Sequence, residues 1–168
     1  MNPLDFSIIR RTRRNHALEH ATIHLLSAAL PGKSLAGRST PFGFYLYGDV
    51  TLDNLTTAVH DALQRLRQGE SHLAIHPGCG TNFLTSGTLA GLAVFAALSV
   101  GDQKNRWSRL PDGLLAATVA LMVAQPIGPK VQQKVTTLAD MDDLTIMAIR
   151  QLGPRGRLTT HYVETTSA

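Results

Sequence analysis

Two long stretches of the sequence contain no Asp, Glu, Lys or Arg, and they constrain the fold more than any other feature. One covers residues 71–101 and the other covers residues 113–129. Residues 83–100 and 110–128 mix small residues with Leu, Val and Phe, and each segment as a helix nearly matches the ~30 Å hydrocarbon core of a bilayer. Small residues also let two such helices approach closely. We therefore expect a transmembrane helical hairpin within 77–129.

The connection between the two apolar segments is short and polar, and it contains Trp107, a residue type that prefers membrane interfaces. A pair of buried helices in a soluble protein is the alternative, because core helices of similar length exist. A core helix in a small domain normally has a polar face, whereas 83–100 has only Thr and Ser as polar residues. This difference favours the membrane interpretation.

The segments 1–76 and 130–168 flank the hairpin and are expected to form one water-exposed α+β domain. A hairpin returns the chain to the side from which it left, so both segments can fold together. Leu55, Val59, Leu63 and Leu66 recur at helical spacing after a Thr51 cap. The patterns predict helices at 12–30 and 51–68 and strands at 43–50, 72–76, 143–152 and 158–165.

Charge and cysteine content exclude several classes of protein. The net charge is +4, but aromatic residues make up only 5% and the basic residues are scattered, so we expect no nucleic-acid partner. One cluster stands apart and is typical of a solvated or membrane-surface patch: Arg10, Arg11, Arg13 and Arg14. The single cysteine, Cys79, excludes an intramolecular disulfide. An apolar run precedes the arginines, the reverse of a secretory signal, so no cleavable signal is expected.

The motif that indicates chemistry is His16-Ala17-Leu18-Glu19-His20, an H-x-x-E-H pattern inside the first predicted helix. Histidines four residues apart lie one turn apart on the same face, so both imidazoles can bind one metal ion. Glu19 lies beside that face, where its carboxylate can take a proton from a metal-activated water. This arrangement is the inverted zincin motif.

A metal site of this kind needs a third protein ligand. His24 lies ~12 Å along the helix from His16, too far to share a centre with bonds of about 2 Å, so we place it at the surface or behind the ligands. Cys79 has flanking glycines and precedes a helix N-terminus that favours the thiolate. His76 is the alternative ligand, or a neighbour that orients another ligand.

The order of these motifs resembles that of the S-ribosylhomocysteinase family, LuxS. The shared features are the HALEH helix, the GFYLYG strand and the Cys79-Gly80-Thr81 turn. The resemblance implies His16, His20 and Cys79 as metal ligands and Glu19 as the acid/base. It also implies the fold of the pitrilysin and mitochondrial processing peptidases, whose third ligand is a downstream Glu that has no evident match here. The second, catalytic cysteine of LuxS is missing, and the entire chain resembles a family of small bacterial membrane proteins of unknown function.

The function predicted from the sequence is a membrane-anchored metal-dependent hydrolase, such as a peptidase, with its site near the membrane surface. Zn²⁺ is the expected cofactor and Fe²⁺ the alternative, and the substrate would be a peptide or a small molecule. The lipid bilayer is an expected partner, and a homo-oligomer would be compatible with the sequence. The alternative is a non-catalytic membrane protein with a structural metal site or a partner-binding domain. A third hypothesis has no metal and an ordinary helix at HALEH.

The distribution of positive charge predicts an orientation in the bacterial inner membrane. The hairpin loop carries Lys104, Arg106 and Arg109, while the other side carries Arg65, Arg67, Lys130, Lys134 and the N-terminal arginines. The excess on the second side favours a cytoplasmic α+β domain.

Overall fold

The computed structural model describes residues 3–100, 107–155 and 158–167 and divides the chain into two compact units. The first unit contains residues 1–76 and 133–168, and the second contains residues 77–132. The second unit therefore ends at residue 132, whereas the hairpin expected from the sequence ends at 129. The α+β class predicted from the sequence is confirmed by the helices and the antiparallel sheet.

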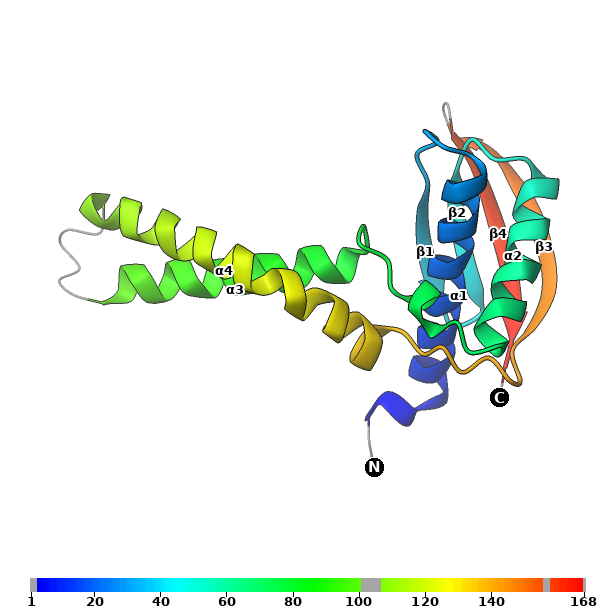
Figure 1. The fold of residues 1–168 in the computed structure, drawn as a ribbon, viewed down its shortest axis with the longest axis horizontal. Coiled ribbons are helices and arrows are strands. Elements are labelled where there is room, and N and C mark those ends of the chain that lie inside the picture. The colour runs from blue at the N-terminus through cyan, green and yellow to red at the C-terminus, as the bar shows by residue number, and fades with distance from the viewer. Residues whose placement is uncertain (1–2, 101–106, 156–157, 168) are drawn as a thin grey trace. The chain divides into compact units, whose positions relative to one another are not determined.

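The first unit is built on a four-stranded antiparallel sheet with the strand order β1-β2-β4-β3. Its strands are β1 (Ala36–Thr40), β2 (Gly43–Gly48), β3 (Thr145–Arg155) and β4 (Leu158–Thr166). Strand β4 lies between β2 and β3, so chain segments from both sides of the hairpin share one sheet (Figure 1). In the β2–β4 register, Phe44 pairs with Val163 and Leu46 with His161, and all four are buried.

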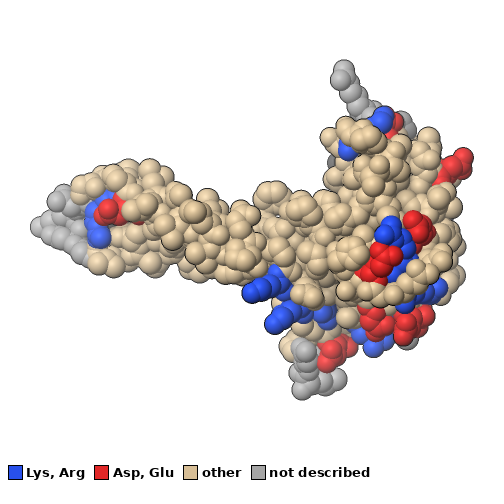
Figure 2. Space-filling model, viewed as in Figure 1, with Lys and Arg blue, Asp and Glu red and all other residues tan. Residues whose placement is uncertain are grey.

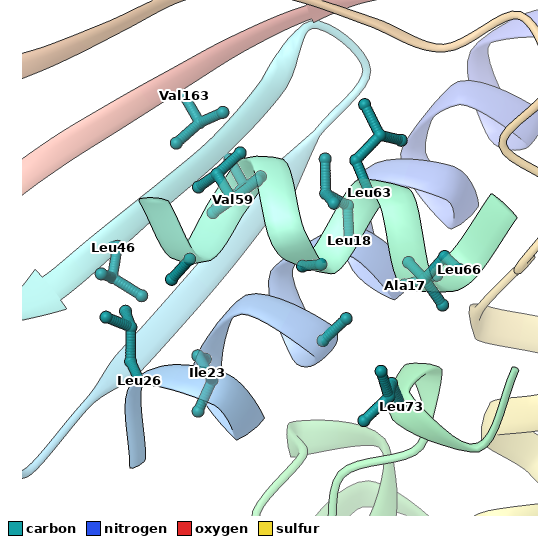
Figure 3. Close-up of a cluster of buried hydrophobic side chains, with 14 of the residues drawn as sticks. Ala17, Leu18, Ile23, Leu26, Leu46, Val59, Leu63, Leu66, Leu73 and Val163 are labelled. Carbon is teal, nitrogen blue, oxygen red and sulfur yellow. The ribbon is translucent and has the colours of Figure 1, made fainter. Parts of the chain in front are cut away.

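Helices α1 (Ser7–Ala29) and α2 (Leu52–Arg67) pack against the sheet and enclose the hydrophobic core. Helix α2 begins after Thr51, whose hydroxyl accepts a hydrogen bond from the Asn54 amide at 3.2 Å, so the predicted cap is confirmed. Figure 3 shows core side chains from both helices beside those from the strands. The core includes Leu18, Leu26, Leu46, Val59, Leu63, Leu66 and Val163.

Two differences from the predicted elements have a physical explanation. Strand β1 was not expected because its core side offers only Gly37 and Ser39, which give no apolar alternation. The strand predicted at 72–76 is wrong: Ser71–Ala74 forms a 3₁₀ turn. The carbonyls of Ala74 and Ile75 pair with histidine rings of α1, which satisfies backbone groups that a strand would use in a sheet.

The second unit consists of helices α3 (Gly80–Ser99) and α4 (Leu110–Val131). Both are long and apolar enough to cross a membrane, with a mean hydropathy of 1.4 in each. None of the apolar stretch of α3 is buried. Figure 2 shows a long surface without charged side chains along this unit. A core helix of a soluble domain would be mostly buried, so the structure gives no support to that alternative. Residues 101–106 of the predicted loop lie outside the described residues.

A polar contact joins the two helices of the hairpin. The Asn82 amide donates to the Pro77 carbonyl at 2.9 Å, and the Gln132 amide donates to Asn82 Oδ1 at 2.7 Å. Gly128 lies against the same Asn82 side chain. Helix α4 continues past its predicted end despite Pro126 and Pro129, and a π-helical turn, Gln132–Thr136, follows it.

Candidate metal centre

Helix α1 places the two motif histidines side by side. His16 and His20 are one turn apart, and their ring centroids lie 4.3 Å from each other. His20 is buried and His16 is half-buried. This face of α1 packs against the 3₁₀ turn Ser71–Ala74 and the segment after the hairpin, and both of these elements offer backbone carbonyls to the rings.

Those carbonyls determine which nitrogen of each ring carries the proton. His16 Nδ1 lies 2.9 Å from the Thr136 carbonyl oxygen, and His20 Nδ1 lies 2.7 Å from the Ala74 carbonyl oxygen. A carbonyl only accepts hydrogen bonds, so in each ring Nδ1 is the donor and Nε2 carries the lone pair. Metal-binding histidines commonly have this arrangement, in which a backbone carbonyl fixes the tautomer and the ring orientation.

Glu19 lies on the side of α1 that faces β1. Its side chain is buried at 4% exposure and accepts a short hydrogen bond from the Ser39 hydroxyl. Gly37 leaves the space that the carboxylate fills, because a Cβ atom there would lie 2.2 Å from Glu19 Oε1. Strand β1 therefore positions the Glu19 carboxylate in two ways: the Ser39 hydroxyl binds it, and Gly37 leaves room for it.

His24 and His76 lie beside this pair but differ from it. His24 donates through Nε2 to the Ile75 carbonyl at 2.8 Å, so its lone pair is on Nδ1, unlike those of His16 and His20. The ring of His76 lies 4.8 Å from that of His24 and 5.7 Å from that of His20. Burial, together with the repulsion that His24 and His20 would exert when protonated, lowers the pKa of His76 to about 4, so this ring is neutral at pH 7.

Cys79 belongs to the second unit, where it caps helix α3. Its sulfur accepts a hydrogen bond from the Thr81 amide at 3.4 Å. A sulfur at a helix N-terminus is stabilised as the thiolate by the helix dipole and the unpaired amides.

The groups that orient the site could not be identified from the sequence. Thr136 and Ala74 act through backbone carbonyls, which have no signature in a sequence. Gly37 and Ser39 lie in a strand that was not predicted. The sequence signal for these two groups is weak. It consists of Gly37 and Ser39, two positions apart and ahead of the GFYLYG strand, and it gains meaning only from the register of β1 on β2.

Comparison with known proteins gives a family and a relative. The family described as domain of unknown function DUF6391 matches residues 11–149. The chain is 36% identical over 161 residues to an uncharacterized protein of Picosynechococcus sp. (strain ATCC 27264 / PCC 7002 / PR-6), a match that covers 90% of this chain and 77% of that protein. No solved structure matches the chain.

Proposed function

Because the chain belongs to the DUF6391 family, whose description assigns no activity, we propose a function from the candidate site. We propose a membrane-anchored metal-dependent hydrolase in which His16, His20 and Cys79 hold a divalent metal. Glu19 is the acid/base in this proposal. Zn²⁺ is the proposed metal, with Fe²⁺ as the alternative.

The observation that carries the proposal is the shared tautomer of His16 and His20. Two neighbouring rings each donate Nδ1–H to a backbone carbonyl, which gives both Nε2 atoms a lone pair for a metal ion. A helix without a metal role would not require both histidines to donate the same ring nitrogen, Nδ1, to a backbone carbonyl. His24 in the next turn has the opposite tautomer, so the match is confined to the motif pair.

Cys79 is the proposed third ligand because the chain tethers it close to the histidines. The ring of His76 neighbours that of His20, and Cys79 follows His76 by three residues. Three extended residues span at most about 11 Å, so the covalent chain limits how far Cys79 can lie from His76. The thiolate that a helix N-terminus favours is the form that binds Zn²⁺.

Glu19 supplies the proton-transfer group in this proposal. A bound divalent metal would lower the pKa of a water molecule and polarise a carbonyl substrate. Glu19 would accept the proton from water and pass it to the leaving group. The Ser39 hydroxyl holds the carboxylate in one position, and its burial keeps bulk water away from it.

The hairpin is proposed to anchor this domain in the bacterial inner membrane with the domain in the cytoplasm. Two helices of sufficient length and apolar character support membrane association. Lys130 and Lys134, with the basic residues of the first unit, support the orientation. A substrate at the membrane surface, either a peptide or a small molecule, would fit a site whose cysteine begins a membrane helix.

Metal content tests the site. We expect a stoichiometric divalent metal in the detergent-purified wild type by inductively coupled plasma mass spectrometry, and its loss in His20→Ala and Cys79→Ser. The matched control is His60→Ala, since His60 is an exposed histidine on α2 whose ring pairs with the Thr56 carbonyl. A wild type that holds no metal after reconstitution with Zn²⁺ or Fe²⁺ would overturn the proposal and leave HALEH an ordinary helix.

A structural, non-catalytic metal site is the second candidate. It is favoured by His76, a ring that is neutral at pH 7 and lies beside His20 and that could complete a closed four-ligand shell. The absorption spectrum of the cobalt-substituted protein separates the two candidates. A spectrum that changes with small anions indicates an open position and supports the hydrolase, whereas an insensitive spectrum supports the structural site.

A further inference from the structure

Two of the four clustered arginines are engaged within the first unit and offer no free binding surface. Arg14 is buried and pairs with Asp140 at 2.9 Å and with Asp143 at 2.5 Å. Arg13 donates to the Thr137 carbonyl at 3.1 Å. The expectation of a solvated cluster is therefore wrong for Arg13 and Arg14, which fasten α1 to the segment after the hairpin.

A cavity of about 210 Å³ lies between α3 and α4, entirely within the second unit. Among the residues that line it, Ala124 and Gly128 are buried and small, while Phe83 and Gln125 are exposed. No charged side chain is among its described lining residues. Sites for whole small molecules usually measure about 300–1,000 Å³, so this volume suits one uncharged side chain of a larger ligand.

The cavity lies beside the proposed metal ligand of the same unit. Pro77 and Asn82 line it, and Cys79 lies between them in the chain. The Asn82 side chain donates to the Pro77 carbonyl at 2.9 Å, and its backbone amide donates to the Cys79 carbonyl at 3.0 Å. Three residues of helix rise only about 4.5 Å, and one extended peptide residue spans about 3.5 Å. A peptide held at Cys79 therefore reaches the cavity within one or two residues.

The polar groups of the cavity suit a peptide backbone. Ser86 and Gln125 contribute a hydroxyl and a side-chain amide to its lining. Helix α4 continues through Pro129, which has no N–H to donate to the Gln125 carbonyl one turn earlier. Helical carbonyls point towards the C-terminal end of the helix, so this carbonyl points towards Pro129, which also lines the cavity. A peptide N–H is a suitable donor for it, and the Gln125 amide is a suitable donor for a peptide carbonyl.

We propose that this cavity is a substrate subsite that binds an uncharged residue of a peptide, one or two residues from the bond at the metal. Ala124 and Gly128 leave room for the side chain, and Ser86 and Gln125 bind the peptide backbone. Charged residues are rejected because burying an unpaired charge is costly and the described lining residues offer no opposite charge. This inference names the substrate class of the proposed hydrolase and rests on that proposed function.

Binding of hydroxamates to the full chain, purified in detergent and loaded with Zn²⁺, tests the subsite. A hydroxamate binds zinc through its two oxygens, so acetohydroxamate probes the metal alone. Isothermal titration calorimetry compares it with acetyl-X-X-hydroxamates in which both X residues are Leu, Gln, Lys or Glu. We expect the Leu and Gln compounds to bind at least about tenfold more tightly than the Lys and Glu compounds.

Two substitutions assign this preference to the cavity. Ala124→Leu fills the cavity and should reduce the preference for the Leu compound over the Lys compound about fivefold. Gln125→Leu changes an exposed side chain and should weaken both uncharged compounds about fivefold through one lost hydrogen bond. Ala120→Leu is the matched control and should leave all affinities unchanged, because Ala120 lines a separate apolar groove of the hairpin.

The outcomes separate failure of the subsite from failure of the metal centre. Binding of acetohydroxamate together with equal affinities for the four peptide compounds overturns the subsite and leaves the metal centre intact. A preference that neither Ala124→Leu nor Gln125→Leu alters overturns its assignment to this cavity. Absence of binding by acetohydroxamate and by all four peptide compounds overturns the open metal centre of the proposed function, and the subsite with it.

Discussion

Gly37 shows how closely β1 approaches the motif helix. A side chain at this position would meet the carboxylate of Glu19, which is already held by the Ser39 hydroxyl. The carboxylate is buried and has little room to move. The position of Glu19 therefore depends on the lack of a side chain at Gly37 and on the hydroxyl of Ser39.

We expect Gly37→Ala to destabilise the protein by about 1–3 kcal/mol, because the added Cβ displaces the Glu19 carboxylate in a packed interior. Combining it with Glu19→Ala should remove most of the clash, so the losses of the two single variants should not add. Thermal unfolding in detergent measures all three. If the stability losses of the two single variants simply add in the double variant, the effect of Gly37→Ala does not arise from a clash with Glu19.

His161 is a buried polar residue in the core face of the sheet. It is fully buried on β4, and neither ring nitrogen has a hydrogen-bond partner among the residues that the structure describes. Burial lowers the pKa of His161 below its ordinary value of 6.5. This burial is consistent with a structural role for His161 in the core.

The lowered pKa predicts a loss of stability in acid. The unfolded chain binds a proton on His161 at a higher pH than the folded chain, so stability present above pH 6.5 is lost as the pH falls below it, by at most about 1.4 kcal/mol per pH unit. His161→Leu should weaken this dependence, while His60→Leu should leave it unchanged. Equal slopes for His161→Leu and the wild type between pH 5 and 7 would contradict the assignment.

At the scale of elements, the hairpin is held by both small and polar residues. A Cβ atom at Gly128 would lie 2.5 Å from Asn82 Oδ1, the same atom that accepts from the Gln132 amide. Gly91, in the middle of α3, has nothing within 4 Å of the corresponding position. Both glycines lie within the apolar helices, but they differ in packing.

Gly128→Ala should lower the unfolding temperature in detergent because the new methyl group displaces Asn82 and breaks its contact with Gln132. Gly91→Ala is the matched control, and we expect it to be neutral or to stabilise by up to about 1 kcal/mol through helix propensity. The same effect from both substitutions would show that the Asn82 contact contributes nothing to the hairpin.

At the scale of the whole molecule, one sheet joins the two ends of the chain across the hairpin. Strand β4 pairs with β2, so the strands before and after the hairpin must lie on the same side of any membrane that it crosses. Both ends of the hairpin therefore emerge together, and the connection between α3 and α4 emerges on the opposite side. The proposed orientation, which rests on the distribution of positive charge, puts that connection outside the cytoplasm.

Cysteine labelling tests this orientation. In a Cys79→Ser background, Ser108→Cys should react in intact cells with a membrane-impermeant maleimide, and His60→Cys should react only after lysis. Ser108 lies just before α4 and His60 lies on α2, so the two positions report opposite sides. The reverse pattern would place the α+β domain outside the cytoplasm and contradict the proposed localisation.

Sequence periodicity was sufficient for features that arise from local physics. Helix α2 was predicted with its cap and its buried face, because Thr51 and the spacing from Leu55 to Leu66 act within one helix. The two apolar helices and the α+β class also follow from composition and spacing. The H-x-x-E-H motif could be recognised because a helix alone brings His16 and His20 together.

Only the tertiary structure decided which partners these residues have. The tautomers of His16 and His20 depend on the Thr136 and Ala74 carbonyls, one of them beyond the hairpin. Strand β1 exists because β2 pairs with it, since its own residues carry no strand pattern. The 3₁₀ turn replaced the expected strand for the same reason: backbone groups bind the partners that the fold supplies, and residues distant in sequence supply them.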